Sequence, residues 1–444
     1  MKIPLTPPPY PGLVLSIPRK RLNVVFENAG QLADSRYLHW DKLRQLDPPA
    51  DLNHEEWWAA LKMGRLQSAR DIEQFRSIDG QPFHYCLPDM VLAAVHDIDS
   101  RARGNITLSE QVTDAGDRNR YMVSSLIEEA ITSSQLEGAA TTRKEAVEML
   151  RSGRQPRDHS ERMILNNYLA MQHILALDKH RLTPEMVLEL HRILARETMN
   201  TPDAAGRPQT QEDKRIKVFD PRDNTLLHTP PPAKELPERL ELMCRFANGE
   251  IGSKGFLHPV IRAIILHFWL AYDHPFEDGN GRTARALFYW AMLREGYWLF
   301  EYLSISSLLR KAPSQYARSY LYTETDGNDL TYFIAYQLKV IRRSLDALDA
   351  YLARKQREIR DAEAKLREIS GLNHRQRALI AHVLRNPTQE YTIESHRRSH
   401  NIAYATARND LLQLAAKNML AVTRKIGKKA FYRRGPALHA EQEI

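Results

Sequence analysis

Hydrophobic residues recur at helical spacing along most of the chain, and few segments alternate in the way that a β-strand requires. The segment 119–137 is a clear example. Met122, Leu126 and Ala130 fall on one face of a helix, and Gly138 follows as a helix-ending residue. The pattern as a whole predicts a mainly α-helical protein.

A β-hairpin is predicted at one place in the central region, "KVFDPRDNTLLHTPPP". Two short apolar runs, Val218–Phe219 and Leu226–Leu227, flank the turn-forming residues "DPRDN". The region 1–103 is expected to be helical, with its tryptophans packed in a small core.

The composition is that of a soluble protein long enough for two or three domains, with 444 residues, 43% hydrophobic and 27% charged. The leader "MKIPLTPPPYPG" lacks the apolar stretch of a signal peptide, and the longest apolar run, "AIILHFWLAY", is too short to cross a bilayer. Only Cys86 and Cys244 are present, so no disulfide framework is predicted. We expect a cytoplasmic protein with no membrane partner.

The net charge of +8 is concentrated at the C-terminal end. From Gly371 onward there are 13 Lys and Arg against 5 Asp and Glu, whereas the preceding residues are balanced. This segment predicts three helices and a hairpin, the order of a winged helix, with Arg424, Lys425, Lys428 and Lys429 on the wing. Such a module either binds DNA through its phosphates or serves as a protein-interaction module, and the sequence leaves both open.

The densest polar chemistry lies in "HPFEDGNGRTAR", residues 274–285, between two predicted helices. It matches neither a Walker A loop nor a G-x-G-x-x-G loop. Its "GNG" triplet lies at a helix N-terminus, where free N–H groups and the helix dipole bind anions. Arg282 and Arg285, three residues apart, would hold further phosphates through forked hydrogen bonds.

Two more side chains extend this interpretation. Asp278 offers a carboxylate to a hard cation that bridges phosphate oxygens, and His274 titrates in the range needed to take a proton from a hydroxyl. A metal site made of His267, His274 and Asp278 is disfavoured, because it lacks H-E-x-x-H spacing. The residues together predict a polyphosphate bound for attack by an alcohol.

The segment "HPFEDGNGRTAR" resembles the signature of the Fic family, H-x-F-x-[DE]-G-N-G-R-x-x-R, at every defined position. Fic-like features extend over roughly Asn105 to Leu338 and include "HTPPP" and "HPVIRAIILHF". The resemblance implies a helical core with a small β-hairpin flap. It also implies transfer of AMP from ATP to Ser, Thr or Tyr hydroxyls of target proteins, with Mg²⁺ as cofactor and Mn²⁺ as an alternative metal.

The resemblance also implies roles by position. His274 would be the general base, Asp278 would hold the metal, Phe276 would anchor the loop, and the hairpin near 217–228 would align the target segment. Residues implied to bind the triphosphate are Gly279, Asn280, Gly281, Arg282 and Arg285, the last at the γ-phosphate.

Two further pairs of residues are assigned by the same resemblance. "SSQLEG" is similar to the inhibitory pattern [ST]-x-x-x-E-[GN] of some Fic proteins, with Ser133 and Glu137 at the defined positions. Glu137 would pair with Arg285 and occlude the γ-phosphate position. Tyr316 and Tyr320 are candidates for the adenine pocket, although the chain departs there from the double-tyrosine pattern expected.

We therefore expect four parts: an N-terminal helical region (1–103), a Fic core with an inhibitory helix (104–338), a helical linker (339–370) and a winged-helix domain (371–436). One alternative is a DNA-binding regulator whose Fic core senses nucleotide. Another is a Fic enzyme that transfers a different group or removes AMP. The target protein is not identified by the sequence, and a homodimer is an assembly open to the chain.

Overall fold

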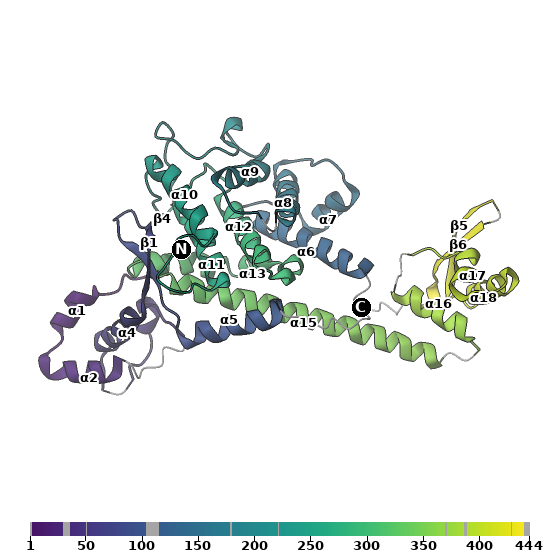
Figure 1. The fold of residues 1–444 in the computed structure, drawn as a ribbon, viewed down its shortest axis with the longest axis horizontal. Coiled ribbons are helices and arrows are strands. Elements are labelled where there is room, and N and C mark those ends of the chain that lie inside the picture. The colour runs from purple at the N-terminus through teal and green to yellow at the C-terminus, as the bar shows by residue number, and fades with distance from the viewer. Residues whose placement is uncertain are drawn as a thin grey trace. The chain divides into compact units, whose positions relative to one another are not determined.

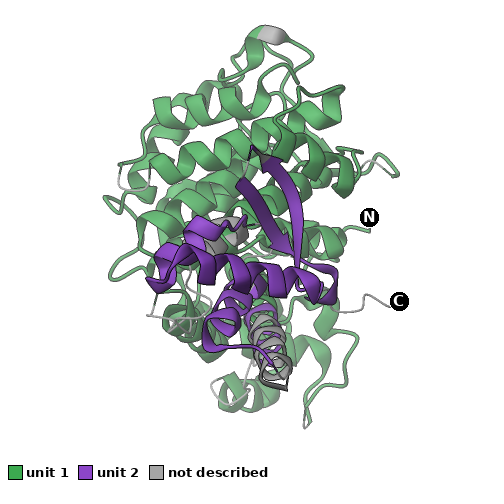
Figure 2. Ribbon diagram, turned by 90° about the vertical axis from the view of Figure 1, so that its right-hand side faces the viewer, with its two compact units in different colours: residues 1–348 green, residues 349–444 purple. Residues whose placement is uncertain are grey.

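The computed structural model describes residues 2–29, 36–49, 51–103, 115–177, 180–220, 222–368, 371–385, 389–427 and 429–438. The chain divides into two compact units, residues 1–348 and 349–444, which are coloured separately in Figure 2. The finer division into four parts stays a prediction.

The chain starts with four helices: α1 (Tyr10–Ser16), α2 (Arg19–Ala29), α3 (Trp40–Leu43) and α4 (His54–Ser68). Asn53 and Glu56 form a capping box at the start of α4, which satisfies backbone N–H groups there. Trp40 and Trp58 are buried in one hydrophobic cluster shared by these helices. The predicted tryptophan core is thus present.

An antiparallel hairpin of β1 (Arg70–Arg76) and β2 (Pro82–Tyr85) follows, and α5 (Asp89–Ala102) comes next. This hairpin departs from the helices expected throughout the region. Its register shifts between Ile72 and Arg76, so the alternation typical of a strand is interrupted. The burial of Phe75 results from tertiary packing and not from a regular alternation along the strand. Its ring stacks between those of Phe83 and Trp269, at centroid distances of 4.0 and 4.2 Å.

The centre of the first unit is helical, as predicted, and its layers are visible in Figure 1. Helices α11 and α12 pack closely along each other, and α6 packs against α8 and α13. The helices are α6 (Ala115–Leu136), α7 (Arg143–Ser152), α8 (His159–Ala176), α9 (Pro184–Ala195), α10 (Leu236–Ala247), α11 (Pro259–Asp273), α12 (Asn280–Arg294), α13 (Ile305–Lys311) and α14 (Pro313–Thr325), with 3₁₀ turns at Pro202–Ala204, Ala233–Glu235 and Trp298–Tyr302. Helix α15 (Thr331–Glu368) begins in the first unit and continues past its last residue, 348.

The predicted central hairpin is present. β3 (Val218–Phe219) pairs antiparallel with β4 (Leu226–His228). The turn between them is held by Asp220, whose backbone carbonyl accepts from Asn224 N at 2.8 Å. Each strand is only two or three residues long, so much of the hairpin's backbone stays unpaired by the partner strand.

The second unit contains α16 (His374–Arg385), α17 (Ile393–His400), α18 (Tyr404–Ala416), β5 (Leu420–Ile426), β6 (Lys429–Arg434) and a 3₁₀ turn at Pro436–Leu438. This is the predicted order of three helices and a hairpin, and the elements share one hydrophobic cluster. Lys428 lies outside the described residues. Within the described ranges, no helix combines the length and the hydrophobicity needed to span a bilayer.

Candidate active site

His274 lies at the C-terminal end of the buried helix α11, in a left-handed conformation (φ 47°, ψ 54°) that is uncommon for a residue with a side chain. Its Nδ1 lies 3.3 Å from the carbonyl oxygen of Ala271, which can only accept, so Nδ1 carries the proton. The lone pair is therefore on Nε2. Burial, and then the nearby His228, lowers the pKa of His274 to about 4, so the ring is neutral at neutral pH.

The loop after His274 is closed by the side chain of Asn280. Its Oδ1 accepts from Phe276 N at 2.9 Å, and its Nδ2 donates to Phe276 O at 2.8 Å. Phe276 is fully buried and stacks on the ring of His191, with 3.6 Å between centroids. The loop is thus fixed from both sides before any ligand arrives.

His191 of α9 is part of this support and was not singled out from the sequence. Its Nε2 donates to Asp278 O at 2.9 Å, and its Nδ1 accepts from Gly206 N at 2.9 Å. Burial lowers the pKa of His191 to about 4, which agrees with a neutral ring. In the sequence it is an ordinary residue of an amphipathic helix, and only tertiary packing brings it under the loop.

Arg215 is a second support that the sequence did not reveal. Its Nη1 donates to His274 O at 2.8 Å and its Nε donates to Pro231 O at 2.8 Å. Partial burial lowers the pKa of Arg215 to about 10. The guanidinium therefore links the segments on both sides of the β3–β4 hairpin to the backbone of His274.

The "GNG" triplet forms the N-terminus of α12, as expected for an anion site. Gly279 is the N-cap residue, with φ 81°, and the helix begins at Asn280. The first backbone N–H groups of any helix have no acceptor within it, and the helix dipole adds positive potential there. This end of α12 is suited to bind phosphate oxygens.

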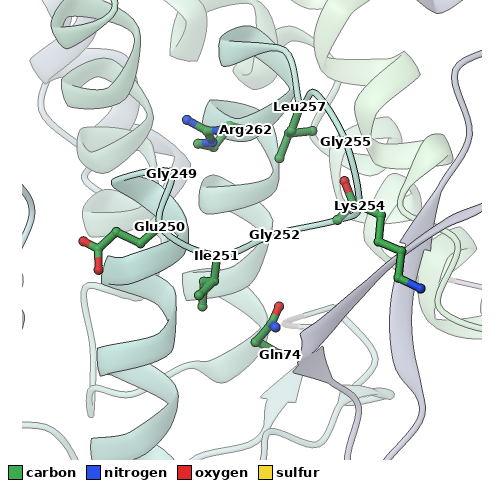
Figure 3. A pocket seen from close by; sticks show the side chains of 10 residues that line it. Gln74, Gly249, Glu250, Ile251, Gly252, Lys254, Gly255, Leu257 and Arg262 are labelled. Atoms are coloured by element: carbon green, nitrogen blue, oxygen red, sulfur yellow. The ribbon is translucent and has the colours of Figure 1, made fainter.

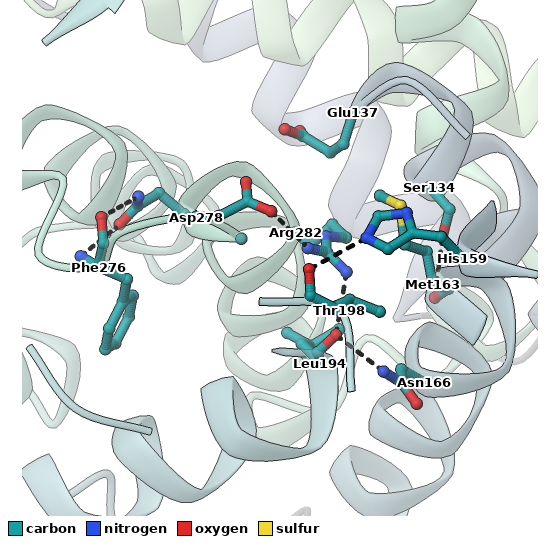
Figure 4. Close-up of polar contacts among 12 residues, drawn as sticks. Ser134, Glu137, His159, Met163, Asn166, Leu194, Thr198, Phe276, Asp278 and Arg282 are labelled. Atoms are coloured by element: carbon teal, nitrogen blue, oxygen red, sulfur yellow. Dashed lines mark hydrogen bonds and ion pairs between the residues drawn. The ribbon is translucent and has the colours of Figure 1, made fainter. Parts of the chain in front are cut away.

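Arg282 is almost completely buried, which the sequence did not indicate. Figure 4 shows its guanidinium directed toward Leu194, whose carbonyl accepts from Nη1 at 2.9 Å. Nη2 lies 3.4 Å from Asp278 Oδ2, and Nε is buried without a partner among the described residues. Arg282 thus ties α9 to the loop and keeps part of its donor capacity unused.

Arg285 is also buried, and it contacts both residues of the "SSQLEG" pattern. Nε donates to Ser133 Oγ at 2.9 Å, and Nη2 donates to Ser133 O at 3.0 Å and to Glu137 Oε1 at 2.9 Å. Oε1 would lie only 2.3 Å from a Cβ placed on Gly281. The Glu137 carboxylate therefore rests directly against the first turn of α12.

Asp278 presents the most exposed carboxylate of the loop, with 54% of its side chain accessible. No group of three or more His, Cys, Asp or Glu suited to a metal occurs among the residues described. A lone carboxylate nevertheless fits Mg²⁺, which commonly takes one or two protein carboxylates and completes its shell with phosphates and water. The donor set favours a metal that arrives with a polyphosphate.

Tyr316 and Tyr320 lie together on α14, half-buried behind Arg285. The Tyr316 hydroxyl lies 2.7 Å from His267 Nε2 and 3.0 Å from the Tyr320 hydroxyl, while the Tyr320 ring packs on Phe333. Burial lowers the pKa of His267 to about 3, so this histidine is a neutral partner of the tyrosine. The adenine role of the two tyrosines stays a prediction.

Residues 181–292 match the model of the Fic/DOC family. The chain thus contains a segment that matches the Fic/DOC family. It is similar to the protein adenylyltransferase Fic of Drosophila ananassae, with 34% identity over 142 residues, covering 32% of this chain and 25% of the relative. The protein of the same name from Drosophila melanogaster is 35% identical over 142 residues, covering 32% of this chain and 26% of the relative. The matched segment is thus about a quarter of the length of these curated relatives.

A solved structure extends the likeness at the level of fold. The crystal structure of a Fic family protein from Desulfovibrio desulfuricans G20 aligns with a TM-score of 0.50 at 17% identity, covering 78% of this chain and 95% of that chain. The prediction of a mainly helical Fic fold is confirmed.

Proposed function

We propose that this Fic protein is a protein adenylyltransferase that transfers AMP from ATP to a Ser, Thr or Tyr hydroxyl of a target protein. The observation that carries the proposal is the neutral His274, whose Nε2 keeps its lone pair a few residues before the N-terminus of α12. The base and the anion site thus belong to one loop, which Asn280, His191 and Arg215 hold through hydrogen bonds. The name of the curated relatives, protein adenylyltransferase, supports this chemistry.

The reaction would proceed by in-line attack at the α-phosphorus. The target hydroxyl oxygen forms a bond to the α-phosphorus, and the bond from that phosphorus to the bridging oxygen of the β-phosphate breaks. The hydroxyl proton passes to Nε2 of His274, and pyrophosphate leaves. The phosphates would themselves favour this proton transfer, because negative charge nearby raises the basicity of an imidazole.

The residues of the loop would share the binding of ATP. The first N–H groups of α12, at Asn280 and Gly281, would hold the α- and β-phosphates, and Arg282 would assist. Arg285 would bind the γ-phosphate. Mg²⁺, or Mn²⁺ as an alternative, would be held by Asp278 and would neutralise charge on the phosphates.

Glu137 would restrain the enzyme. A γ-phosphate and the Glu137 carboxylate carry the same charge and need the same guanidinium, which Glu137 and Ser133 occupy. ATP would then enter with its triphosphate displaced, and the α-phosphorus would be out of line with the hydroxyl. A shift of about 1 Å suffices to slow a positioned reaction severely.

The β3–β4 hairpin would receive the target segment by strand addition. Phe219 and Leu226 are paired across the hairpin and are exposed by 44% and 41%, so they offer two neighbouring apolar side chains to a bound strand. Arg215 joins the hairpin's stem to His274, so a strand bound there would present its hydroxyl to the base.

The second unit supports an additional function, binding of an anionic partner. It carries the charge excess of the chain, and we propose that it is a winged helix whose α18 and β5–β6 hairpin contact DNA. Glu390 would compete with DNA phosphates for two arginines of this hairpin, since it pairs with Arg424 at 2.7 Å and with Arg433 at 3.3 Å. A protein-interaction module remains the alternative, and a cytoplasmic location and a homodimer remain expectations.

A labelling experiment tests the adenylyltransferase proposal. The Glu137→Gly chain, incubated with cell lysate, should label protein from ATP carrying ³²P at the α-position and should not label it from ATP carrying ³²P at the γ-position. Adding His274→Ala should lower the labelling rate by about 10²–10⁴-fold, the contribution of one general base. Labelling from the γ-position alone, or a rate unchanged by His274→Ala, would refute the proposal.

A further inference from the structure

The β3–β4 hairpin needs contacts outside itself to keep its position. Its strands share two residue pairs, Val218 with His228 and Phe219 with Leu226, and the register shifts between them. A two-stranded hairpin is marginally stable on its own in water, and one this short has few ladder hydrogen bonds. The position of the hairpin therefore depends on the side chains that attach it to the helices.

His228, the last residue of β4, makes two such contacts. Its Nε2 donates to Tyr272 O on α11 at 2.7 Å, and its Nδ1 lies 2.8 Å from Oε2 of Glu324 on α14. The ring also packs against that of Tyr272, with 4.7 Å between centroids. One buried side chain thus joins the hairpin to two helices.

Both partners of the His228 ring are acceptors, which determines its protonation. A carbonyl oxygen only accepts, so Nε2 carries a proton, and the carboxylate of Glu324 requires a second proton on Nδ1. With both protons the ring is an imidazolium. His258, at the other end of α11, differs. Its Nδ1 accepts from Val260 N at 3.3 Å and its Nε2 lies 2.9 Å from Asp99 Oδ2, so a neutral ring satisfies both contacts.

The C-terminal end of α11 favours a cation at this place. The helix ends at Asp273, so the carbonyl groups of its last turn lack partners within the helix, and the helix dipole adds negative potential there. Arg215, which precedes β3, donates to Asp273 O in the same turn. Two cationic side chains, one on each side of the hairpin, therefore attach it to the end of α11.

The charges around His228 support its protonated form. Burial opposes the charge, but the contacts with Glu324 and Tyr272 O outweigh burial and raise the pKa of His228 above 6.5. Glu324 has no other ion-pair partner among the described residues. Asp273 also favours the charge, although it is itself paired with Arg239 of α10 at 2.7 Å.

Two further basic groups near the hairpin titrate well away from His228. Burial, and then His228, lowers the pKa of His274 to about 4, and burial lowers the pKa of Arg215 to about 10. The two histidines of the site are thus held in opposite states, His274 neutral and His228 charged.

We propose that His228 is a positioning residue for the target: as an imidazolium, it holds the β3–β4 hairpin against α11 and α14 and so fixes the surface that receives the target segment. The role of that surface rests on the proposed function, whereas the attachment of the hairpin does not. Both contacts are complete below about pH 6.5. As the pH rises through the raised pKa of His228, Nδ1 loses its proton, its lone pair faces the Glu324 carboxylate, and the hairpin should loosen.

Hydrogen–deuterium exchange of the full chain tests the attachment without ATP or a target. Exchange in peptides that contain β3 and β4 is measured at about pH 6 and about pH 9, on either side of the expected titration, and divided by the intrinsic rate at each pH. The wild-type hairpin should exchange about tenfold or more faster at the higher pH, since a charge-assisted hydrogen bond is lost. His228→Phe, which keeps a ring but has no N–H group, should exchange fast at both pH values.

Glu324→Gln separates the charge from the packing. Its amide can donate to a neutral Nδ1, so both contacts survive without the second proton, and the hairpin should stay protected at both pH values. His258→Phe is the matched control, because it removes the pair with Asp99 at the other end of α11. Figure 3 shows that end, where Leu257 and Arg262 border a surface hollow. This variant should keep the wild-type response to pH.

Transfer of label from ATP carrying ³²P at the α-position gives a second readout in the Glu137→Gly chain. Adding His228→Phe should lower labelling of lysate protein by about tenfold at both pH values. The affinity for ATP, measured by calorimetry, should not change, since His228 contacts Tyr272 and Glu324 and not the groups assigned to ATP. Adding Glu324→Gln should raise labelling relative to Glu137→Gly at the higher pH alone.

Three results would overturn the proposal. They are wild-type exchange that is equal at both pH values, a Glu324→Gln hairpin that loosens with pH as the wild type does, and labelling that is unchanged by His228→Phe. Absence of labelling by every chain, with exchange as expected, would instead count against the transfer reaction and leave the attachment established. Circular dichroism of each variant at both pH values establishes that folded proteins are compared.

Discussion

At the scale of single residues, the pKa of His274 makes a prediction about the pH dependence of transfer. Burial and the neighbouring His228 lower this pKa from 6.5 to about 4, so the neutral base is fully present above that range and disappears as the pH falls through it. Between about pH 5 and about pH 8, kcat/KM of the Glu137→Gly chain for ATP, which reports the enzyme before ATP binds, should therefore show no inflection from His274. A rate that falls to half near about pH 6.5, the range of an exposed histidine, would contradict the burial of the base.

The residues of the loop could be predicted from the sequence because their chemistry is set by local spacing. His274, the "GNG" triplet and the two arginines lie within twelve consecutive residues, and a turn followed by a helix brings them together. His191 and Arg215 could not be predicted in this way. Each donates to a backbone carbonyl of the loop from a distant part of the chain, His191 to Asp278 and Arg215 to His274. In the sequence, neither residue can be distinguished from any other buried polar residue.

At the scale of elements, the position of α6 depends on a second carboxylate, Glu129. This buried side chain accepts from the Tyr289 hydroxyl at 2.9 Å and from Ser304 Oγ and Ser306 N, both at 3.0 Å. Burial raises the pKa of Glu129, and the hydrogen bonds that its carboxylate accepts from several donors partly oppose that rise. Glu129 and Glu137 are eight residues apart, at the C-terminal half of α6 and just after its end, and the first fixes the helix that presents the second.

We predict that Glu129→Leu loosens α6 and raises AMP transfer above the wild-type rate, though by less than Glu137→Gly does. It should also lower the free energy of unfolding by about 1–3 kcal/mol, because buried donors lose their acceptor. Glu128→Leu is the matched control, since the neighbouring Glu128 side chain pairs with Arg143 at the surface. Equal transfer by the wild type and the Glu129→Leu chain, measured without denaturant, would show that Glu129 stabilises the fold alone.

The two hairpins of the first unit show which elements could be predicted. The β3–β4 hairpin was predicted because turn-forming residues separate two apolar runs. The β1–β2 hairpin was missed because its register shift breaks the alternation, and because Phe75 is buried through contacts with Phe83 and with Trp269 on α11. Local pattern specifies the first hairpin, whereas tertiary packing specifies the second.

At the scale of the whole molecule, the charge excess of the second unit makes a prediction about salt. If this unit binds DNA, the affinity of the full chain for duplex DNA should fall steeply with salt. Lys428→Ala with Lys429→Ala should reduce that slope by about 0.9 for each phosphate that the protein no longer neutralises. Arg397→Ala with Arg398→Ala should change it less, since Glu394 already pairs with both arginines. Absence of a mobility shift at low salt would leave the interaction-module alternative.

Restraint of an adenylyltransferase by Glu137 is tested most directly by one measurement. Transfer from α-³²P-labelled ATP into lysate proteins is compared for the wild type, Glu137→Gly, Arg285→Ala and Glu137→Gly with His274→Ala. Glu137→Gly should raise the rate by about 10²-fold, the cost of a displaced phosphate. Arg285→Ala should not raise it, because the arginine is then missing from ATP too. The double variant should be about 10²–10⁴-fold slower than Glu137→Gly alone. Equal rates for the wild type and Glu137→Gly, in a lysate where another Fic enzyme labels the same protein, would show that Glu137 merely ends a helix.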